Sequence, residues 1–247
     1  PDSHFPVPPS HSVMPTVAEL FQSMEYGPAP EGDAQARTWL GKFERVFGHF
    51  IDGEWTDPGD TFDVINPSNR EVIGRVSQGT HADVDAAVAA ARAALPAWQA
   101  LDGHARARHL YAIARGIQKH ARLFAVVETM DNGSLLMGNV HRVVPRAAQN
   151  IEFFADWAMT LDGHTIDSPE VVNHVKYDPA GVAVLITPWN APLMLTTWKV
   201  GPALAAGNTI VVKPPEWAPL TCSLMADIAH EAGVPPGVLN VVQGIGE

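Results

Sequence analysis

Three short apolar runs, each followed by a polar or glycine-containing loop, constrain the fold of this chain more than any other feature. The runs cover residues 182–187, 209–212 and 239–242. Two segments of helical periodicity, residues 192–206 and 219–232, separate them. Glycines at the end of each segment are typical helix C-cap signals. The second part of the chain is therefore predicted to fold as β-α-β-α-β.

Continuously apolar strands that alternate with helices indicate a parallel sheet with both faces covered, as in one half of a doubly wound α/β fold. Ligands of such folds bind beyond the carboxyl ends of the strands. Asn190, Lys213, Glu216 and Gly244 all follow the predicted strands. We therefore expect a polar rim at that edge of the sheet.

The segments LITPWNAPL, WKVGPALAAGNTIVVKPPEWAPLT and EAGVPPGVLNVVQGIG occur in this order and resemble the aldehyde dehydrogenase superfamily. From about Phe50 onward the chain resembles the front half of such an enzyme. A finer resemblance, to semialdehyde dehydrogenases of aromatic breakdown, rests on VPRAAQNIEFFADW and WKVGPALAAGNT. The implied fold is α/β, the front half of a doubly wound parallel-sheet NAD-binding domain with part of an oligomerisation flap.

The resemblance also implies a division of the chain. Residues 1–47 are expected to form a proline-rich leader with short helices, and residues 48–247 a partial NAD-binding domain. Residues 165–179 would form the oligomerisation region, in which a strand at 172–178 pairs with a neighbouring subunit. A homo-oligomer, dimer or tetramer, is implied for the full-length protein.

The segment before the three runs is predicted from local signals alone. Its short helices are expected at residues 16–24 and 33–43, and its strands at residues 49–55, 63–66 and 72–76, which would form a small antiparallel element.

Three longer helices should follow. Thr80 and Asp83 form an N-cap signature for the first, which Pro96 is expected to close. The second is predicted to run as one helix with its apolar stripe from Leu110 to Met130, and the third covers residues 144–158. We interpret these helices as packing for the sheet.

Composition excludes some partners. The net charge is −11 with a pI near 5.4, and no basic cluster offsets it, which argues against nucleic acid or an anionic membrane. No apolar stretch of membrane-spanning or signal-peptide length is visible. One cysteine excludes an internal disulfide framework and is compatible with the cytoplasm as the default compartment. The eleven histidines show no metal-ligand spacing.

Asn190 and the pair Lys213 and Glu216 have ordinary interpretations as well as functional ones. An asparagine after a strand is often a turn former, and a lysine at a strand end is often a solvated gatekeeper. The resemblance implies that the Asn190 amide stabilises an oxyanion, and that Lys213 and Glu216 bind the adenine ribose of NAD. Because a carboxylate repels a 2′-phosphate, Glu216 favours NAD over NADP.

Ile186, Thr187, Trp189 and Gly246 match positions that shape the cofactor crevice of the superfamily. Trp189 has an alternative interpretation as an anchor of the core. A glycine at 246 would permit close approach of the adenine, although the Gly-Ile-Gly sequence also suits an ordinary turn.

The implied reaction is oxidation of a small aldehyde to a carboxylic acid through a cysteine thiohemiacetal and thioester, with a glutamate base. In the superfamily, both residues lie beyond the last residue of this chain. Cys222 falls within the second crossover helix, away from the rim, and we interpret it as a packed bystander. Two alternatives therefore stay open, a non-catalytic fragment or assembly module of a larger aldehyde dehydrogenase, and a nucleotide-binding module with another task.

Overall fold

The computed structural model describes residues 16, 32–42 and 44–246. Apart from Thr16, residues 1–31 of the predicted leader, with the helix at 16–24, therefore lie outside the described residues. Residues from Asp33 on form one compact unit. Its bounds, in chain order, are α2 Ala34–Gly41, β1 Val46–Phe47, β2 Phe50–Ile51, β3 Glu54–Trp55, β4 Thr61–Ile65, β5 Val72–Ser77, α3 His81–Gln99, α4 Gly103–Lys119, α5 Ala121–Asn132, α6 Leu136–Gly138, the π-helical segment η1 Asn139–Val143, α7 Val144–Ala158, β6 His164–Asp167, β7 Val172–Val175, β8 Val182–Ile186, α8 Pro192–Ala205, β9 Thr209–Lys213, α9 Leu220–Glu231 and β10 Leu239–Val241.

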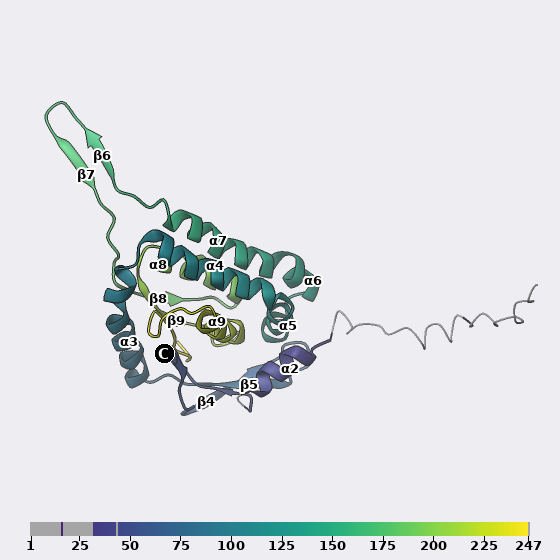
Figure 1. Ribbon diagram of the computed structural model, residues 1–247. Coiled ribbons are helices and arrows are strands. Elements are labelled where there is room, and N and C mark those ends of the chain that lie inside the picture. Colours follow the sequence, from purple (N-terminus) through teal and green to yellow (C-terminus); the bar gives the residue numbers. More distant parts are fainter. Residues whose placement is uncertain (1–15, 17–31, 43, 247) are drawn as a thin grey trace, which may run out of the picture. The chain divides into compact units, whose positions relative to one another are not determined.

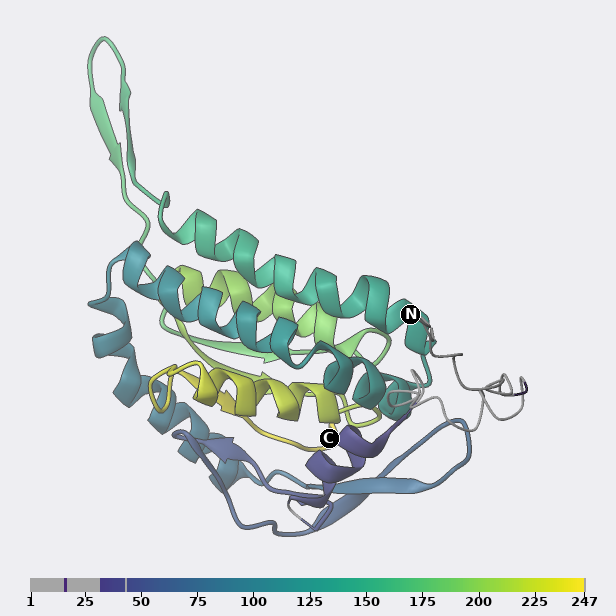
Figure 2. The same ribbon diagram turned by 45° about the vertical axis from the view of Figure 1, so that its right-hand side comes forward.

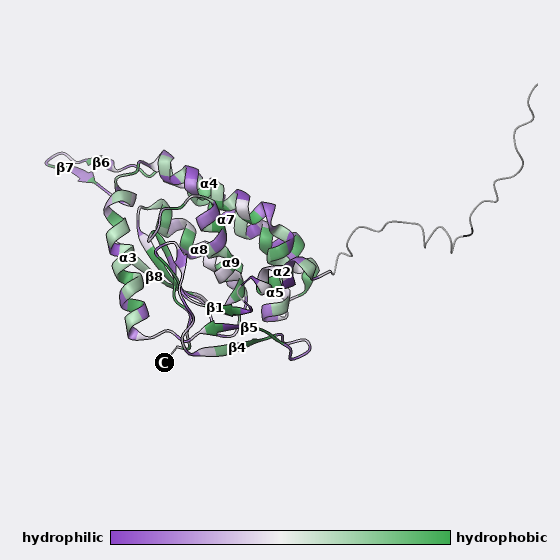
Figure 3. Cartoon of the chain, turned by 60° about the horizontal axis from the view of Figure 1, so that its bottom comes forward, coloured by the Kyte–Doolittle hydropathy of each residue, from purple (hydrophilic) through white to green (hydrophobic). Residues whose placement is uncertain are grey.

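The central sheet confirms the predicted β-α-β-α-β unit. Its strand order is β3-β2-β10-β9-β8, with β8, β9 and β10 parallel. The helix α3 lies on one face of these strands, while α8 and α9 lie on the other (Figure 1). In a second layer, α4 and α7 run over α8 (Figure 2). The core consists of the inward faces of the helices together with the apolar strands, which are green in Figure 3.

The sequence signals for helix termini are confirmed at most helix ends. Thr80 and Asp83 form a complete capping box at the start of α3. The helices α5, α8 and α9 are followed by Gly133, Gly207 and Gly233, each in the left-handed conformation that glycine tolerates. The helix α7 covers residues 144–158 as predicted, with its proline in the first turn.

Two helix predictions are wrong. Pro96 lies inside α3, which continues to Gln99, because a proline near a helix end disturbs only the turn before it and the Pro96 carbonyl still accepts the N–H of Ala100. The second long helix is two helices, α4 and α5. His120 separates them with φ −103° and ψ 22°, which turns the chain so that α5 packs against α9.

The predicted small antiparallel element is divided between two sheets. The strands β4 and β5 pair antiparallel, with β1 parallel to β5. The strands β2 and β3 instead form a hairpin that joins the central sheet, where Phe50 is opposite Val241. Asp52 and Gly53, both with positive φ, form its two-residue turn, the Asp-Gly signal for such hairpins.

The strands β6 and β7 pair with each other and form an arm that extends from the rest of the unit (Figure 1). All four residues of β6 are exposed, and so are the first three of β7. The predicted strand at 172–178 is thus shorter, Val172–Val175. No helix of the described residues is long and apolar enough to span a membrane.

The strand β8 is at an edge of the central sheet and leaves apolar side chains open. Val184 and Ile186 are 60% and 65% exposed. They lie on the same face as Val182, which packs against the residues that α3 covers. An open edge with exposed β-branched residues promotes association between copies of a chain.

We predict that the isolated chain self-associates through this surface and that Val184→Lys reduces the association, because a charge on an edge strand opposes pairing. Sedimentation velocity across a range of concentrations measures it. Concentration-independent monomer for the unaltered chain would contradict the prediction.

Candidate nucleotide-binding crevice

The parallel register brings the first two predicted loops together. Val182 is opposite Thr209 and Ile186 is opposite Lys213, so β8 and β9 end side by side. The Thr187 N–H donates to the Lys213 carbonyl at 3.1 Å and extends the pairing by one residue. Because β10 continues the same sheet, its loop at Gly244 follows the third strand at the same edge.

Lys213 and Glu216 form an ion pair at this rim. Lys213 Nζ lies 3.1 Å from Glu216 Oε2, and both side chains are partly buried. The two prolines between them restrict the backbone of the loop. The backbone N–H of Glu216 and then the Lys213 ammonium hold the pKa of the Glu216 carboxyl below its usual value. The rim therefore presents a cation and a carboxylate side by side, a donor and an acceptor suited to a diol.

Asn190 and Trp189 are exposed in the loop after β8. Among the described residues, the Asn190 side chain makes no hydrogen bond, so the local turn-forming bond of the ordinary interpretation is not present. The Trp189 ring lies 6.0 Å from the ring of Trp217, which follows Glu216. A pocket of about 360 Å³ lies between the two loops and β4, and Trp189, Glu216, Trp217 and Asp131 are among its lining residues, whereas Asn190 is not.

Thr187 differs from the other predicted crevice residues because it is buried. Its hydroxyl donates to the Lys213 carbonyl at 3.3 Å and lies 3.8 Å from Cys222 Sγ. Ile186 is exposed on the open sheet face, and its carbonyl accepts a bond from Lys199. Thr187 thus joins the loops, whereas Ile186 presents an apolar surface.

The third loop lines a pocket of about 260 Å³ together with Lys213 and the start of α3. Gly244 and Ile245 are among its lining residues, while Gly246 lies just outside it and is exposed. Gly79 forms the opposite wall, and a Cβ on it would meet the Gln243 carbonyl oxygen at 2.6 Å. Close approach of these two backbones needs glycine at 79.

Cys222 is packed in the interior. Its thiol is 3.1 Å from the Thr196 hydroxyl, and burial raises its pKa to about 12. A thiol must ionise to be a good nucleophile, so this residue is unsuited to that role near neutral pH.

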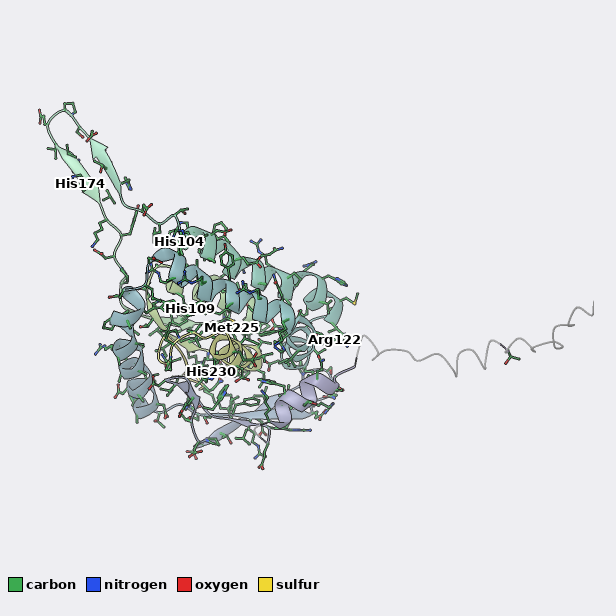
Figure 4. The ribbon with its side chains drawn as sticks, in the orientation of Figure 1. His104, His109, Arg122, His174, Met225 and His230 are labelled. Atoms are coloured by element: carbon green, nitrogen blue, oxygen red, sulfur yellow. The ribbon has the colours of Figure 1, made fainter. Side chains whose placement is uncertain are left out.

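The histidines are spread over several elements. Figure 4 shows His104 and His109 on α4, His174 on the β6–β7 arm and His230 on α9. Within the part of the chain that the structure describes, no three histidine, cysteine or acidic side chains are grouped so as to hold a metal ion.

Sequence reasoning missed two buried carboxylates on α5. Glu128 is fully buried and Asp131 is 1% exposed. Burial raises the pKa of the Glu128 carboxyl to about 7 and that of Asp131 well above its ordinary value. A signal was present, because Glu128 and Asp131 continue the apolar stripe of Phe124 and Val127 at helical spacing.

A third missed residue is Arg146, on α7. It lines a pocket of about 330 Å³ with the side chains of Gln149, Asn150, Phe153, Phe154 and Trp198. Among the described residues, Arg146 forms no ion pair. The pocket thus combines exposed aromatic rings with one guanidinium.

The aldehyde dehydrogenase family model matches residues 55–247. The chain belongs to the aldehyde dehydrogenase family. This membership agrees with the three-loop rim, and the α/β fold matches that of solved aldehyde dehydrogenase structures.

Three relatives illustrate the similarity. An aldehyde dehydrogenase of Alternaria alternata is 41% identical over 211 residues, which are 84% of this chain and 42% of the relative. A 2-hydroxymuconic semialdehyde dehydrogenase of Pseudomonas sp. (strain CF600) is 44% identical over 206 residues, 80% and 42% of the two chains. PnpE from Pseudomonas sp. WBC-3, also solved in complex with nicotinamide adenine dinucleotide, has a TM-score of 0.78 and 41% identity, with 81% and 42% covered.

The chain therefore spans about 42% of the length of these relatives. Their names agree with the superfamily resemblance of the loop motifs, and one of them is named as a semialdehyde dehydrogenase.

The raised pKa of Glu128 predicts how stability depends on pH. Because the folded chain holds this proton more tightly than the unfolded chain, the stabilisation is complete below about pH 4.5 and is lost as pH rises through about 7. Its full size is on the order of 3 kcal/mol. We expect the free energy of unfolding to fall over this range, and to fall less in Glu128→Gln.

Urea denaturation at pH 5 and pH 8 measures the difference. Asp131 contributes in the same direction, and the Glu128 charge is one cause of its raised pKa, so the comparison reports Glu128 together with its effect on Asp131. Equal pH dependence of the two proteins would contradict the assignment.

Proposed function

We propose that this chain supplies the cofactor-binding half of an NAD-dependent aldehyde dehydrogenase, which oxidises an aldehyde to a carboxylic acid. The observation that carries the proposal is the Lys213–Glu216 pair, 3.1 Å apart, beside the exposed side chain of Ile186. These groups fit one end of NAD, because the ribose diol needs a donor and an acceptor, and the adenine needs apolar surface.

The other predicted residues have roles around that pair. Trp189 and Gly246 would shape the crevice. Thr187 would hold the ends of β8 and β9 together, because its hydroxyl donates to the Lys213 carbonyl. The carboxylate of Glu216 supports a preference for NAD over NADP, since a 2′-phosphate would be repelled. When bound, NAD would accept the hydride of the aldehyde.

Asn190 would act at the reacting carbonyl. Its exposed amide makes no hydrogen bond to another described residue, so its N–H groups are free to donate to an oxyanion. A donor directed at developing negative charge typically lowers the activation barrier by about 2.7 to 4 kcal/mol. Cys222 is not the nucleophile of this reaction, because it is buried with a pKa of about 12. We propose that a cysteine nucleophile and a glutamate base come from the remainder that the relatives possess.

The substrate side is proposed to accept an aldehyde that carries a carboxylate. The pocket between α7 and α8 holds the guanidinium of Arg146, which forms no ion pair with a described residue, among Phe153, Phe154 and Trp198. Trp198 lies six residues into α8, about 9 Å along the axis from the helix start beside Asn190. A planar guanidinium binds carboxylates well, and the semialdehyde dehydrogenase relative supports this substrate class.

Assembly and location follow the family. The exposed β6–β7 arm supports a homo-oligomer, dimer or tetramer, in which the arm pairs with another subunit. We further propose that the protein is cytoplasmic and that a partial NAD-binding domain begins near residue 48.

The alternative of a non-catalytic fragment or assembly module is favoured by one observation, the burial of Cys222. Formation of NADH at 340 nm by the 247-residue chain with NAD and small aldehydes distinguishes the two. Turnover would contradict the fragment, and turnover abolished by Cys222→Ala would also contradict our assignment of that thiol.

We predict that the double substitution Lys213→Ala and Glu216→Ala weakens NAD binding by at least about tenfold, or 1.4 kcal/mol, because both contacts to the ribose diol are lost. Isothermal titration calorimetry on the chain and on a longer protein that contains it measures the affinity. Thr209→Val, which loses a hydrogen bond at the opposite end of β9 from Lys213, is the matched control. Unchanged affinity in the double variant would contradict the site.

Arg146→Met is expected to raise the KM for an aldehyde that bears a carboxylate by about tenfold or more, because an ion pair is lost while the apolar volume is kept. The KM for a neutral aldehyde of similar length should change little. The two values are measured in a catalytically active protein that contains the chain. An equal change for both substrates would show that Arg146 does not select charge.

A further inference from the structure

Two helices start directly after the loops of the crevice and lack caps of their own. The helix α8 begins at Pro192, two residues after Asn190, and its N-cap Ala191 has no side-chain acceptor. The helix α9 begins at Leu220, four residues after Glu216, and its N-cap Pro219 makes no cap hydrogen bond. The first N–H groups of a helix need acceptors, most of all when they are buried.

Carboxylates from α5 supply these acceptors. Asp131 Oδ2 accepts the N–H of Leu220 at 2.7 Å, and the N–H of Thr221 also stabilises its charged form. Glu128 Oε2 accepts the Thr221 hydroxyl at 2.7 Å, and the N–H of Leu193 stabilises its charged form. Asp131 therefore accepts hydrogen bonds from the start of α9 only, whereas Glu128 contacts the first turns of both helices.

Burial makes this arrangement costly to rearrange. Glu128 Oε1 and Asp131 Oδ1 have no hydrogen-bond partner among the described residues, so each buried carboxyl is held by few donors. Loss of one donor would leave a buried oxygen unsatisfied, which costs about 1 to 3 kcal/mol. The first turns of α8 and α9 thus both contact the Glu128 side chain, in addition to packing against each other.

The two loops directly precede the helices whose first turns Glu128 contacts. Leu193 is three residues after Asn190, and Thr221 is five residues after Glu216. The ring pair of Trp189 and Trp217, 6.0 Å apart, bridges the same two loops. A shift of one helix start relative to the other would change this ring separation.

We propose that Glu128 is a positioning residue, which sets the spacing between the Asn190 loop and the Lys213–Glu216 loop through its contacts to the starts of α8 and α9. The effect on NAD binding rests on the proposed function. The effect on the two tryptophans does not, so the two can be tested separately.

The experiment uses ¹⁹F NMR of the chain labelled with 5-fluorotryptophan, with the signals of Trp189 and Trp217 assigned by Trp→Phe substitutions. Glu128→Gln replaces one acceptor oxygen with an amide donor, so that a single oxygen is left for the Thr221 hydroxyl and the N–H of Leu193. Thr221→Val removes the hydroxyl at nearly constant volume, while Thr221→Ser keeps it.

The matched control is Thr209→Val. The Thr209 hydroxyl is also buried and donates to the Ala91 carbonyl at 2.8 Å, but it lies at the opposite end of β9 from the crevice. This variant loses one buried hydrogen bond without touching α5, α8 or the start of α9. It therefore reports what loss of stability alone does to the signals.

We expect Glu128→Gln and Thr221→Val to shift both tryptophan signals and to weaken NAD binding by about fivefold or more, with Thr221→Ser close to the unaltered chain. Thr209→Val should lower the melting temperature and leave both signals and the affinity unchanged. If Glu128→Gln does not fold, Thr221→Val decides the outcome.

Three possible results test the proposal. Unmoved signals in variants that are only less stable would show that Glu128 is ordinary core and would overturn it. Moved signals with unchanged NAD affinity would overturn its functional part. Should the unaltered chain bind no NAD, the proposed function fails, and moved signals would still support the positioning role.

Discussion

The parallel pairing of β8, β9 and β10 is the constraint on which the rest of the structure depends. Because Ile186 is opposite Lys213, the loops after these strands must start at one edge of the sheet. The crossover helices then return the chain to the opposite edge, and their first turns lie under the loops. Backbone hydrogen bonds thus decide which side chains meet, and the ion pair of Lys213 and Glu216 is a consequence of that pairing.

Most of the central fold could be predicted, because its signals are local and repeat in phase. Apolar runs, a capping box and glycines after helices each report on a few neighbouring residues. The errors fall where distant contacts decide. Pro96 stays helical because α3 has packing on the sheet to hold its last turn. His120 separates two helices that both contact α7 and α9, while α8 contacts the first and η1 the second. No local sequence pattern near residue 50 indicates that β2 pairs with β10.

The site was predictable in the residues that follow strands and less so elsewhere. Asn190, Lys213 and Glu216 stand out because polar groups end apolar runs. Glu128 and Arg146 lie on helices that resemble packing, and their importance comes from what other elements bring to them. For Glu128 the partners are helix starts on α8 and α9, which only the tertiary structure reveals.

The hairpin of β2 and β3 extends the central sheet at one edge, where β2 pairs with β10. The Asp52 N–H donates to the Asn240 side chain across 188 residues of sequence. During synthesis, the early hairpin therefore has no partner until nearly all of this chain has left the ribosome. Long-range pairing of this kind is slow to form, since a large loop must close first. Until then the side chain of Phe50, which is buried in the folded unit, lacks the strand that pairs with its backbone.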